Sequence, residues 1–564
     1  MKKLPGFTYA ALIAGLVLGC SQQDSGEPAA DETRTASPAK TEATVATRHA
    51  LPPNNPFLMQ GSSYSHVHFD AAANDVSRVA AWTGEMTLTD ANVDWLPWVT
   101  TIGAAHRLYD NGEEALIVSG TNKVGKIQIT NGDFSWIDEI IVPGFEYDTP
   151  TVEQMEETVA AMRMAGNDEA EYLRPFAKHI SDIRQGAATI MNGTYVVMDH
   201  EGNYFGGWGT TVYKVSDVNP GDINSKIEIV SSYNIKDGLA PEEAEKISRL
   251  VAISMTYDGY LAIAMPGIIA VLDRELSKME YILLEGEAVD NGISVDKDGG
   301  IYLVTSKYMR KLVWNGKTIS DREEDGAWKT TYDDVPNPKS LSRGAGNTPA
   351  LMGHGPDDDK LVLLADSGEN IKVVAFWRDA IPEDFEQKPG TKSRRVADQL
   401  DLTIDVPATI EWSPHIYGNG VMMMASAWPD PIYDESGKLQ LFDTVMTAGA
   451  TRAPPIGVEK WSWDKETRTL KSDWTVLRGL QWALYPVSAA NNSVTLTVFE
   501  EGIYSLLTVD WDTGEELGNA VLGNNPILNT MGGLYVPIDA DRTYITGVFG
   551  PAMINREQEV SQQN

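Results

Sequence analysis

Short runs of alternating apolar and polar residues, separated by Gly, Asn and Asp, follow one another from about residue 51 onward. Such alternation is typical of β-strands with one buried face. The run ISMTYDGYLAIAM (Ile253 to Met265) returns as ISVDKDGGIYLVT (Ile293 to Thr305), at an offset of about 40 residues. In both copies an Asp-Gly turn closes a hairpin and a third strand follows. A unit of about 40 residues with three or four strands indicates one blade of a β-propeller.

Weaker copies of this unit bring the number of candidate blades to eight, with seven as the alternative count. They begin near Asp110-Asn111-Gly112, Asn192-Gly193, Asp357 to Lys360, Asn419-Gly420, Asn491-Asn492 and Asp541-Arg542. The pattern therefore predicts an all-β chain folded as a seven- or eight-bladed β-propeller with small helical insertions. Two packed β-sandwiches are the alternative, but sandwiches show no self-similarity at this spacing. A closed ring has to pair its ends, so we expect residues about 62–70 or 78–90 to complete the last blade.

Two segments depart from the strand pattern. Residues 150–184 combine helical spacing with good helix formers, and residues 240–250 predict a shorter helix. Blades of one propeller differ mostly in their loops, so the long excursions are expected to cover one mouth of the ring. These excursions lie at 318–346, 379–407 and 428–457.

The N-terminus carries a targeting signal. Lys2 and Lys3 precede an apolar stretch that ends at Leu18, too short for a membrane span of about 20 residues, which indicates a signal peptide. Val17-Leu18-Gly19-Cys20 resembles the lipobox of bacterial lipoproteins. The resemblance implies that Cys20 becomes the mature N-terminus and carries palmitate-type acyl chains that anchor it in the membrane. Ser21 after the cysteine favours sorting to the outer membrane in lipoproteins that follow that rule.

The chain thus divides into four parts. Residues 1–19 are the expected signal peptide, and the small, polar, Pro-containing residues 20–50 are an expected disordered tether. Residues 51–556 form the expected propeller, and residues 557–564 are a tail. No later run of 18 apolar residues predicts a transmembrane helix.

Composition narrows the function classes. The chain has 45 Lys and Arg against 80 Asp and Glu, a formal charge of -35, which argues against nucleic acid as a partner. A hydrophobic content of 42% is enough for a folded core. The single Cys excludes an intramolecular disulfide framework, Fe–S clusters and CxxC redox chemistry.

Two stretches carry a family resemblance. DNGISVDKDGGIYLVTS (Asp290 to Ser306) and KLVLLADSGENIKVVAFW (Lys360 to Trp377) resemble blades of the gluconolactonase, strictosidine-synthase and calcium-dependent lactonase propellers. In that six-bladed family an axial Ca²⁺ is held by a Glu, two Asn and an Asp from different blades, and the metal polarises a carbonyl or phosphoryl oxygen. The resemblance implies the metal ligands Asn291, Asn347, Asp366 and Glu411. The alternative for Asn291 and Asp366 is a turn role, in which they bind their own backbone.

Other motifs carry less chemistry. His66 and His68, two apart on one expected strand, are either half of a Zn²⁺ site or polar rim residues. Asp296 and Asp298 favour a hairpin turn over a calcium loop, because further acidic ligands are missing. The apolar run Gly418 to Trp428 is either blade core or the wall of an apolar mouth. Four more histidines near strand ends are candidate proton shuttles or bonded rim groups: His106, His200, His354 and His415.

The chain also resembles eight-bladed quinoprotein dehydrogenases in blade count and in Trp-rich strand ends, but their vicinal disulfide cannot form with one Cys. Two functions follow. The first is a lipid-anchored binding or scaffold protein of the cell envelope, which captures an apolar or amphiphilic ligand for uptake or contacts an envelope protein. The second is a calcium-dependent esterase or lactonase built around Asn291 and Asp366, with Ca²⁺ as its cofactor.

Overall fold

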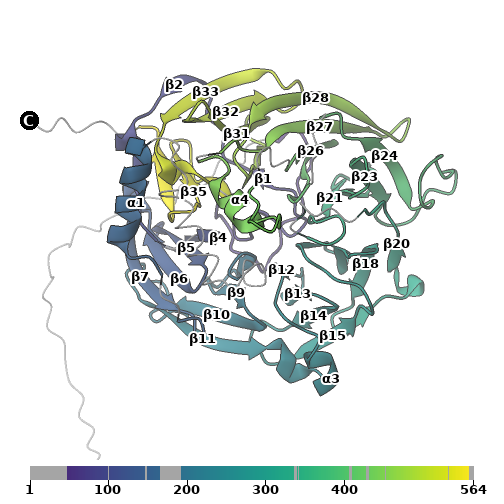
Figure 1. Ribbon diagram of the computed structural model, residues 1–564. Helices are drawn as coiled ribbons and strands as arrows, with labels where there is room; N and C mark the ends of the chain where they lie inside the picture. The colour runs from purple at the N-terminus through teal and green to yellow at the C-terminus, as the bar shows by residue number, and fades with distance from the viewer. Residues whose placement is uncertain are drawn as a thin grey trace, which may run out of the picture. The chain divides into compact units, whose positions relative to one another are not determined.

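The strands of the protein stand radially around one axis (Figure 1). The structure is a computed structural model that describes residues 47–98, 101–146, 149–165, 192–335, 340, 342–404, 410–426, 431–450, 452–530 and 532–557. Within these residues the strands form eight sheets, which we number as blades 1 to 8 in chain order. The predicted seven- or eight-bladed β-propeller with small helical insertions is therefore confirmed. The predicted lipidation site, Cys20, and the tail beyond residue 557 lie outside the described residues.

The first four blades follow one another along the chain, each as an antiparallel meander. Blade 1 has β4 (Thr101–Leu108), β5 (Glu114–Gly120), β6 (Lys123–Gln128) and β7 (Ser135–Ile141). Blade 2 has β8 (Val196–Met198), β9 (Tyr204–Trp208), β10 (Thr211–Asp217) and β11 (Ile227–Asn234). Blade 3 has β12 (Ala252–Met255), β13 (Leu261–Met265), β14 (Ile268–Leu272) and β15 (Met279–Leu283). Blade 4 has β16 (Ile293–Val295), β17 (Gly300–Val304), β18 (Met309–Trp314), β19 (Ile319–Ser320) and β20 (Trp328–Thr330).

The last two blades include strands from the N-terminal part of the chain. Blade 5 has β21 (Ala350–Met352), β22 (Leu361–Ala365), β23 (Lys372–Trp377) and β24 (Val396–Asp401). Blade 6 has β25 (His415–Tyr417), β26 (Gly420–Met424), β27 (Ile456–Asp464) and β28 (Thr469–Gly479). Blade 7 has β1 (Val76–Ser77), β30 (Val487–Ser488), β31 (Ser493–Glu500), β32 (Ile503–Asp510), β33 (Glu516–Gly523) and β2 (Gly84–Thr87). Blade 8 has β29 (Ala483–Leu484), β34 (Gly533–Pro537), β35 (Arg542–Ile545), β36 (Ala552–Asn555) and β3 (Val93–Trp95).

The repeated Asp-Gly turns close the hairpins, as predicted. In blade 4 the Asp296 carboxylate accepts N–H bonds from Asp298 (2.9 Å) and Gly300 (2.8 Å), and its other oxygen accepts the Tyr302 hydroxyl (2.6 Å). Gly299 between them has φ of 84°, which a residue without Cβ adopts at little cost. Asp296 therefore acts as a turn residue.

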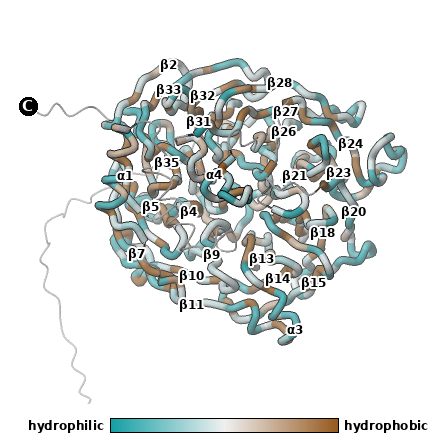
Figure 2. The backbone as a smooth tube through the Cα atoms, viewed as in Figure 1, coloured by the Kyte–Doolittle hydropathy of each residue, from teal (hydrophilic) through white to brown (hydrophobic). Residues whose placement is uncertain are grey.

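Each blade is buried on both faces because it lies between two others. In β13 of blade 3, Leu261, Ile263 and Met265 belong to a cluster shared with blade 2, whereas Ala262 and Ala264 pack toward blade 4. This alternation follows from the two-residue period of a strand. Figure 2 shows that hydrophilic residues gather in outer loops, for instance beside β24.

Tryptophans tie neighbouring blades together. Trp314 Nε1, at the end of the third strand of blade 4, donates to Asp258 Oδ2 in the first turn of blade 3 (2.9 Å). Trp463 Nε1 of blade 6 makes the same bond to Asp359 Oδ2 of blade 5 (2.9 Å). A large indole with one polar N–H can fill the space between two sheets and still satisfy its donor.

The ring closes through three N-terminal strands. β1 pairs in parallel with β30, β2 pairs in parallel with β33, and β3 pairs antiparallel with β36. The expected strand within 78–90 therefore exists as β2 but joins blade 7, and β3 completes the last blade. The expectation for residues 62–70 is wrong, because this alternating run lies along the axis and forms no strand. A segment that is buried on several sides can show the same alternation of apolar and polar residues as a strand at the edge of a sheet.

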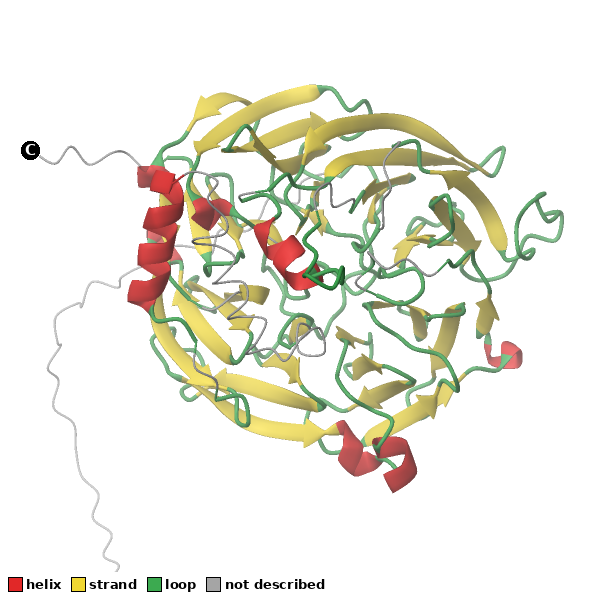
Figure 3. Ribbon diagram, in the orientation of Figure 1, coloured by secondary structure: helices red, strands yellow, loops and turns green. Residues whose placement is uncertain are grey.

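Helices lie in the loops outside the sheets (Figure 3). The predicted insertion at 150–184 contains α1 (Val152–Ala165), and its remainder falls outside the described residues. The expected helix at 240–250 is limited to α3 (Pro241–Ala244), preceded by η4 (Ile235–Gly238). The excursion at 428–457 contains α4 (Leu441–Thr447). Short 3₁₀ turns are η1 (Asp90–Asn92), η2 (Thr130–Gly132), η5 (Glu323–Asp325) and η6 (Pro526–Leu528). Among the described helices, all fall short of the length and apolar character that a membrane span requires.

Candidate functional site

A short stretch of the chain, residues 63–77, runs through the centre of the ring and is called the axial segment below; it ends in β1, near the centre of Figure 1. Its carbonyl groups accept N–H bonds from the innermost strands of six blades. These bonds are His106 N to Tyr64 O (3.0 Å), Met198 N to Ser65 O (2.8 Å), Val295 N to Ala71 O (2.7 Å), Leu351 N to Ala72 O (3.0 Å), Ile416 N to Asn74 O (2.9 Å) and Val487 N to Asp75 O (2.8 Å).

Side chains of the axial segment reach the other two blades. His66 Nε2 lies 3.1 Å from Ser254 Oγ of blade 3, and Ser63 Oγ donates to Ile538 O beside blade 8 (2.9 Å). One segment can contact all eight blades only if it lies on the axis. The chain itself therefore occupies the channel that a propeller leaves at its centre.

Three residues of the axial segment have unusual backbone dihedral angles. Phe69, Ala73 and Asp75 have φ values of 61°, 57° and 58°, in the left-handed region. Each such residue with a Cβ costs about 1–3 kcal/mol and persists only where the surroundings impose it. These bends let the segment change direction between one innermost strand and the next.

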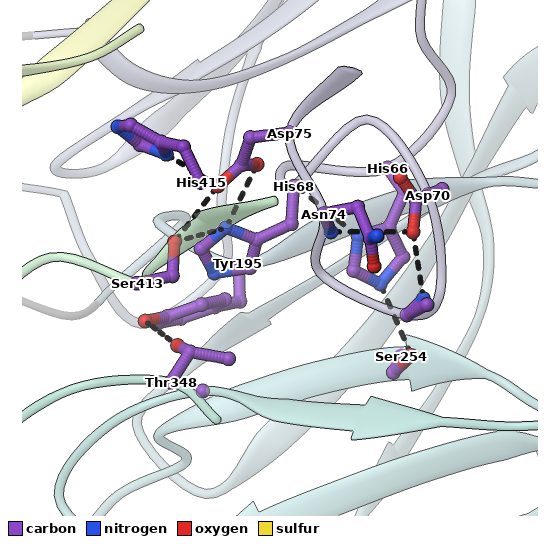
Figure 4. A network of polar contacts seen from close by, with 12 residues as sticks. His66, His68, Asp70, Asn74, Asp75, Tyr195, Ser254, Thr348, Ser413 and His415 are labelled. Carbon is purple, nitrogen blue, oxygen red and sulfur yellow. Dashed lines mark hydrogen bonds and ion pairs between the residues drawn. The ribbon is translucent and has the colours of Figure 1, made fainter. Parts of the chain in front are cut away.

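Asp75 is the charged centre of this arrangement (Figure 4). Its side chain is fully buried, with Oδ1 3.2 Å from His68 Nδ1 and Oδ2 3.1 Å from His415 Nδ1. Ser413 Oγ also donates to Asp75 Oδ2 (2.8 Å). Burial alone would raise the pKa of Asp75, but the imidazoles of His68 and His415 outweigh it and hold that pKa below its usual value. A buried carboxylate with these three partners links the axial segment to blade 6.

The imidazoles around Asp75 differ in their partners. Burial, and then the neighbouring His68, lower the pKa of His66 to about 3, so its ring is neutral at pH 7. Nε2 of His68 and Nε2 of His415 are buried and have no hydrogen-bond partner within the part of the chain that the structure describes. No group of three His, Cys, Asp or Glu side chains among the described residues is arranged to hold a metal ion. We therefore assign this cluster to holding the axial segment.

The remaining predicted histidines are bonded in place. His106 Nδ1 accepts the N–H of Ser63 (2.8 Å), and burial lowers the pKa of His106 to about 4. His354 Nε2 lies 3.0 Å from Leu351 O, and burial followed by Arg378 lowers the pKa of His354 to about 4. The His200 ring packs edge-on against Phe57 at 5.7 Å.

Three of the four predicted metal ligands lie close together: Asn291, Asn347 and Glu411. They belong to the loops that precede the innermost strands of blades 4, 5 and 6. Asn291 Nδ2 donates to the backbone O of Glu411 (3.2 Å), and Asn347 Nδ2 donates to Ile410 O (3.5 Å). Asp366 joins them indirectly, because Asn347 Oδ1 accepts the N–H of Ala365 (3.2 Å).

The side-chain oxygens of both Asn residues, and one oxygen of Asp366, accept hydrogen bonds within the protein. Asn291 Oδ1 accepts bonds from the Tyr195 hydroxyl, Gly292 N (2.7 Å) and Thr348 Oγ1 (3.0 Å). Asp366 Oδ1 accepts the N–H of Lys372 (2.7 Å). Ca²⁺ needs six to eight oxygens, and the two Asn side chains do not offer theirs in this arrangement. Calcium at these four residues stays a prediction.

A larger feature lies between blades 6 and 7 and is called the groove below; its volume is about 1180 Å³. Its walls are the ends of β28 and β33, the β31–β32 hairpin and α1. Two apolar side chains of its wall face solvent to an unusual extent, Leu477 at 63% and Ile503 at 41%. Val498, Phe499 and Tyr504 extend the apolar lining. Large apolar side chains that lie together and exposed on a protein surface commonly mark a binding site.

The groove also has a distinct charge. Its lining contains Arg163, Arg452 and Arg478 against Glu500 and Glu501, whereas the whole chain carries -35. Arg478 Nε donates to Glu500 Oε2 (2.7 Å), and Arg163 Nη1 pairs with Asp90 Oδ2 outside the lining (2.6 Å). With Asp90 counted, the arginines and the carboxylates at the groove balance, so the groove is an apolar-floored site without a net charge on an acidic protein.

Sequence reasoning missed both Asp75 and the groove. Asp75 follows the run Ala71-Ala72-Ala73, which carries no motif. The groove residues come from positions more than 300 residues apart, Arg163 and Ile503 among them, so only the fold brings them together. One local signal was present, an exposed Ile503 directly after the acidic turn Glu500-Glu501-Gly502.

Comparison with known proteins gives little beyond the fold. No family model matches the chain. An uncharacterized protein of Archaeoglobus fulgidus is 28% identical over 322 residues, which is 54% of this chain and 59% of that protein, so the chain spans less than two thirds of its relative.

Several solved propeller structures are similar. A europium-containing methanol dehydrogenase covers 87% of this chain and 90% of its own, at 9% identity and a TM-score of 0.46. BamB from Moraxella catarrhalis covers 62% and 90%, at 12% identity and a TM-score of 0.30. Virginiamycin B lyase from Staphylococcus aureus covers 82% and 98%, at 10% identity and a TM-score of 0.36. The eight radial sheets themselves define the class: the chain is a β-propeller protein, with its channel filled by its own axial segment.

The Asp75 cluster can be tested by stability. Asp75→Asn removes the charge that both imidazoles face and leaves them with one neutral acceptor. We expect the free energy of unfolding to fall by about 3–5 kcal/mol, as for a broken buried ion pair. Calorimetry at pH 7 measures this. Because folding lowers the pKa of Asp75, its contribution is present above the ordinary value of 3.8 and is lost as pH falls through the lower folded value.

The matched control is Asp512→Asn. Asp512 pairs with Arg48 at 3.1 Å, but both side chains are largely exposed, so its loss should change stability by less than about 1 kcal/mol. Equal losses in the two variants would contradict the role given to Asp75.

Proposed function

We propose that the protein is a lipid-anchored binding protein of the bacterial cell envelope that captures an amphiphilic ligand in the groove between blades 6 and 7. The acyl part of the ligand lies on the apolar floor, and an anionic head group lies toward the arginines. The lipid on Cys20 and the tether of residues 20–50 hold the propeller at the outer membrane, where such ligands occur.

The observation that carries the proposal is the occurrence of exposed apolar side chains beside arginines on an otherwise acidic chain. Leu477 and Ile503 are exposed in a groove of about 1180 Å³, above the usual 300–1,000 Å³ of small-molecule sites. Covering one such side chain contributes about 1.5–3 kcal/mol at full burial, a reason for an acyl chain to enter. The three lining arginines are charged hydrogen-bond donors, which an anionic head group can contact, on a chain whose net charge is strongly negative.

The closed axis supports the same site. Many propellers bind ligands at the central mouth, but here the axial segment bonds to the innermost strands of the ring. A ligand that entered the channel would have to displace these backbone bonds, each worth about 0.5–1.5 kcal/mol net. The groove lies away from the axis and needs no such displacement.

A fluorescent fatty acid, 11-(dansylamino)undecanoate, tests the groove. We expect it to bind the wild-type protein with a blue shift and increased emission, because its chain leaves water. Leu477→Glu and Ile503→Glu place a carboxylate on the apolar floor, and each should weaken binding about tenfold or more. Fluorescence titration measures both dissociation constants.

Val230→Glu is the matched control. Val230 lies on the outer strand β11 and is 46% exposed, so the same substitution adds a charge at an equally open apolar position outside the groove. Binding should stay unchanged in this variant. Equal binding by all three variants, or none by the wild type, would overturn the groove as the ligand site.

The anchor is tested separately through Cys20. Two or three acyl chains, at about 0.8 kcal/mol per buried CH₂, hold the wild type in the membrane through a salt wash. Cys20→Ala removes the lipidated thiol, so the protein should lose its palmitate label and leave the membrane fraction. Ser21→Asp keeps the cysteine, and we expect it to stay membrane-bound but to move to the inner membrane. A Cys20→Ala protein that stays with the membrane would contradict the anchor.

The alternative is a calcium-dependent esterase or lactonase. It is favoured by the neighbourhood of Asn291, Asn347 and Glu411, with buried Asp366 beside it. Metal ions would polarise the carbonyl of an ester there. Calcium binding at Asp366, measured in the experiment that closes the next subsection, separates this alternative from the binding protein.

A further inference from the structure

A second cavity lies between blades 4 and 5, at about 300 Å³, and is called the Asp366 pocket below. It shares no lining residue with the groove. Ser306 comes from the β17–β18 turn, Arg343 from the connection into blade 5, and Asp366 and Ile371 from the two sides of the β22–β23 turn. The pocket therefore gathers side chains from three separate connections between strands.

Asp366 supplies the pocket with a buried acceptor. The residue is 2% exposed, and Oδ2 has no hydrogen-bond partner among the described residues, while Oδ1 accepts the N–H of Lys372 (2.7 Å). Lys372 Nζ lies 3.6 Å from Oδ2 but donates to Asp333 Oδ2 at 3.0 Å. Burial of a carboxylate without a hydrogen bond is costly, so this oxygen is prepared for a donor that the chain does not supply.

The charges around the pocket favour a cation. Arg343 lines the pocket, but its Nε and Nη2 both bind Asp290, at 2.6 and 2.9 Å. Asp334 also lines the pocket, and its Oδ1 accepts the hydroxyl of Ser367 (2.7 Å). Two carboxylates therefore face a cavity whose one lining cation is already neutralised.

The walls favour an organic cation over a bare metal ion. Val335, Ala345, Ile371 and Ile410 line the pocket beside the carboxylate. A hard metal ion needs oxygen on most of its surface, whereas an alkylammonium presents N–H groups on one end and carbon on the other. The aromatic walls that recognise quaternary ammonium ions are missing from the described lining, so a primary or secondary amine, which can donate to Oδ2, fits better.

We infer that the Asp366 pocket is a second binding site, for a small primary or secondary alkylammonium ion that donates an N–H to Asp366 Oδ2 and lays its alkyl group against Ile371 and Ile410. The inference does not depend on the groove. Burial, partly opposed by bonds from Lys372, raises the pKa of Asp366 to about 6. The inference rests on the position of Asp366 at the cavity and on its unpartnered Oδ2.

Isothermal titration with isobutylammonium chloride tests this on the whole chain. We expect the wild-type protein to bind it at pH 7.5. Asp366→Asn keeps an acceptor for the Lys372 N–H but removes the charge, and it should weaken binding about tenfold or more. Ile371→Trp fills the cavity and leaves the carboxylate in place, and it should also abolish binding. This second variant keeps the test valid if Asp366→Asn folds poorly. Asp298→Asn, a largely exposed carboxylate at another hairpin, is the matched control and should bind as the wild type does.

Two other probes make the outcome decisive. Isobutanol has the same carbon skeleton without charge and should bind at least about tenfold more weakly than the amine. Calcium chloride should neither bind at Asp366 nor displace the amine. Calcium binding that Asp366→Asn abolishes would overturn the inference and favour the esterase alternative. Amine binding that is absent, or that is unchanged in Asp366→Asn, would also overturn it, and neither result bears on fatty-acid binding in the groove.

Discussion

Eight blades around one axis leave the edges of their innermost strands facing a channel, and the backbone groups on those edges need hydrogen-bond partners. The axial segment supplies them: its carbonyls accept N–H groups from six innermost strands, and its side chains reach the other two blades. An unpaired buried amide would cost about as much as the bond it lacks. Asp75, with His68 and His415 on its two oxygens, fixes where this segment sits. The same part of the chain fills the channel and closes the ring, because the axial segment ends in β1 and the chain then continues into β2 and β3.

Because the axial segment fills the channel, the candidate binding sites lie between blades and away from the axis. Among the histidines that were candidates for metal binding or proton transfer, His66, His68 and His415 are buried and hold the axial segment, whereas His200 is exposed. Asn291 and Asn347 donate hydrogen bonds to neighbouring backbone carbonyls. The cavities that are left lie between blades, one apolar with arginines and one with a buried carboxylate.

The sequence predicted the blades well and the site poorly, for physical reasons. The Ile253 and Ile293 repeats, with their Asp-Gly turns, carry the local information that hairpins need, so the blade type followed from the sequence, whereas seven and eight blades both stayed open. The run from Ser65 to His68 alternates like a strand, and alternation cannot distinguish a sheet edge from a segment buried on every side. Asn291 Nδ2 donates to the backbone O of Glu411, but the tertiary hydrogen bonds that engage the Asn291 side chain follow from the fold and leave no pattern in the sequence. Arg163 and Ile503 meet only because α1 and blade 7 pack, and no sequence pattern encodes that.

Hydrogen–deuterium exchange of the full chain tests the central claim most directly. The amide of Val67 donates to Val196 O, and that of Ala72 donates to Asp70 Oδ1, both deep in the ring. If the axial segment is an integral part of the propeller, these amides should exchange as slowly as those of β13, through unfolding of the whole domain. Exchange of Val67 and Ala72 within seconds, while β13 stays protected for hours, would show an open channel and contradict the account.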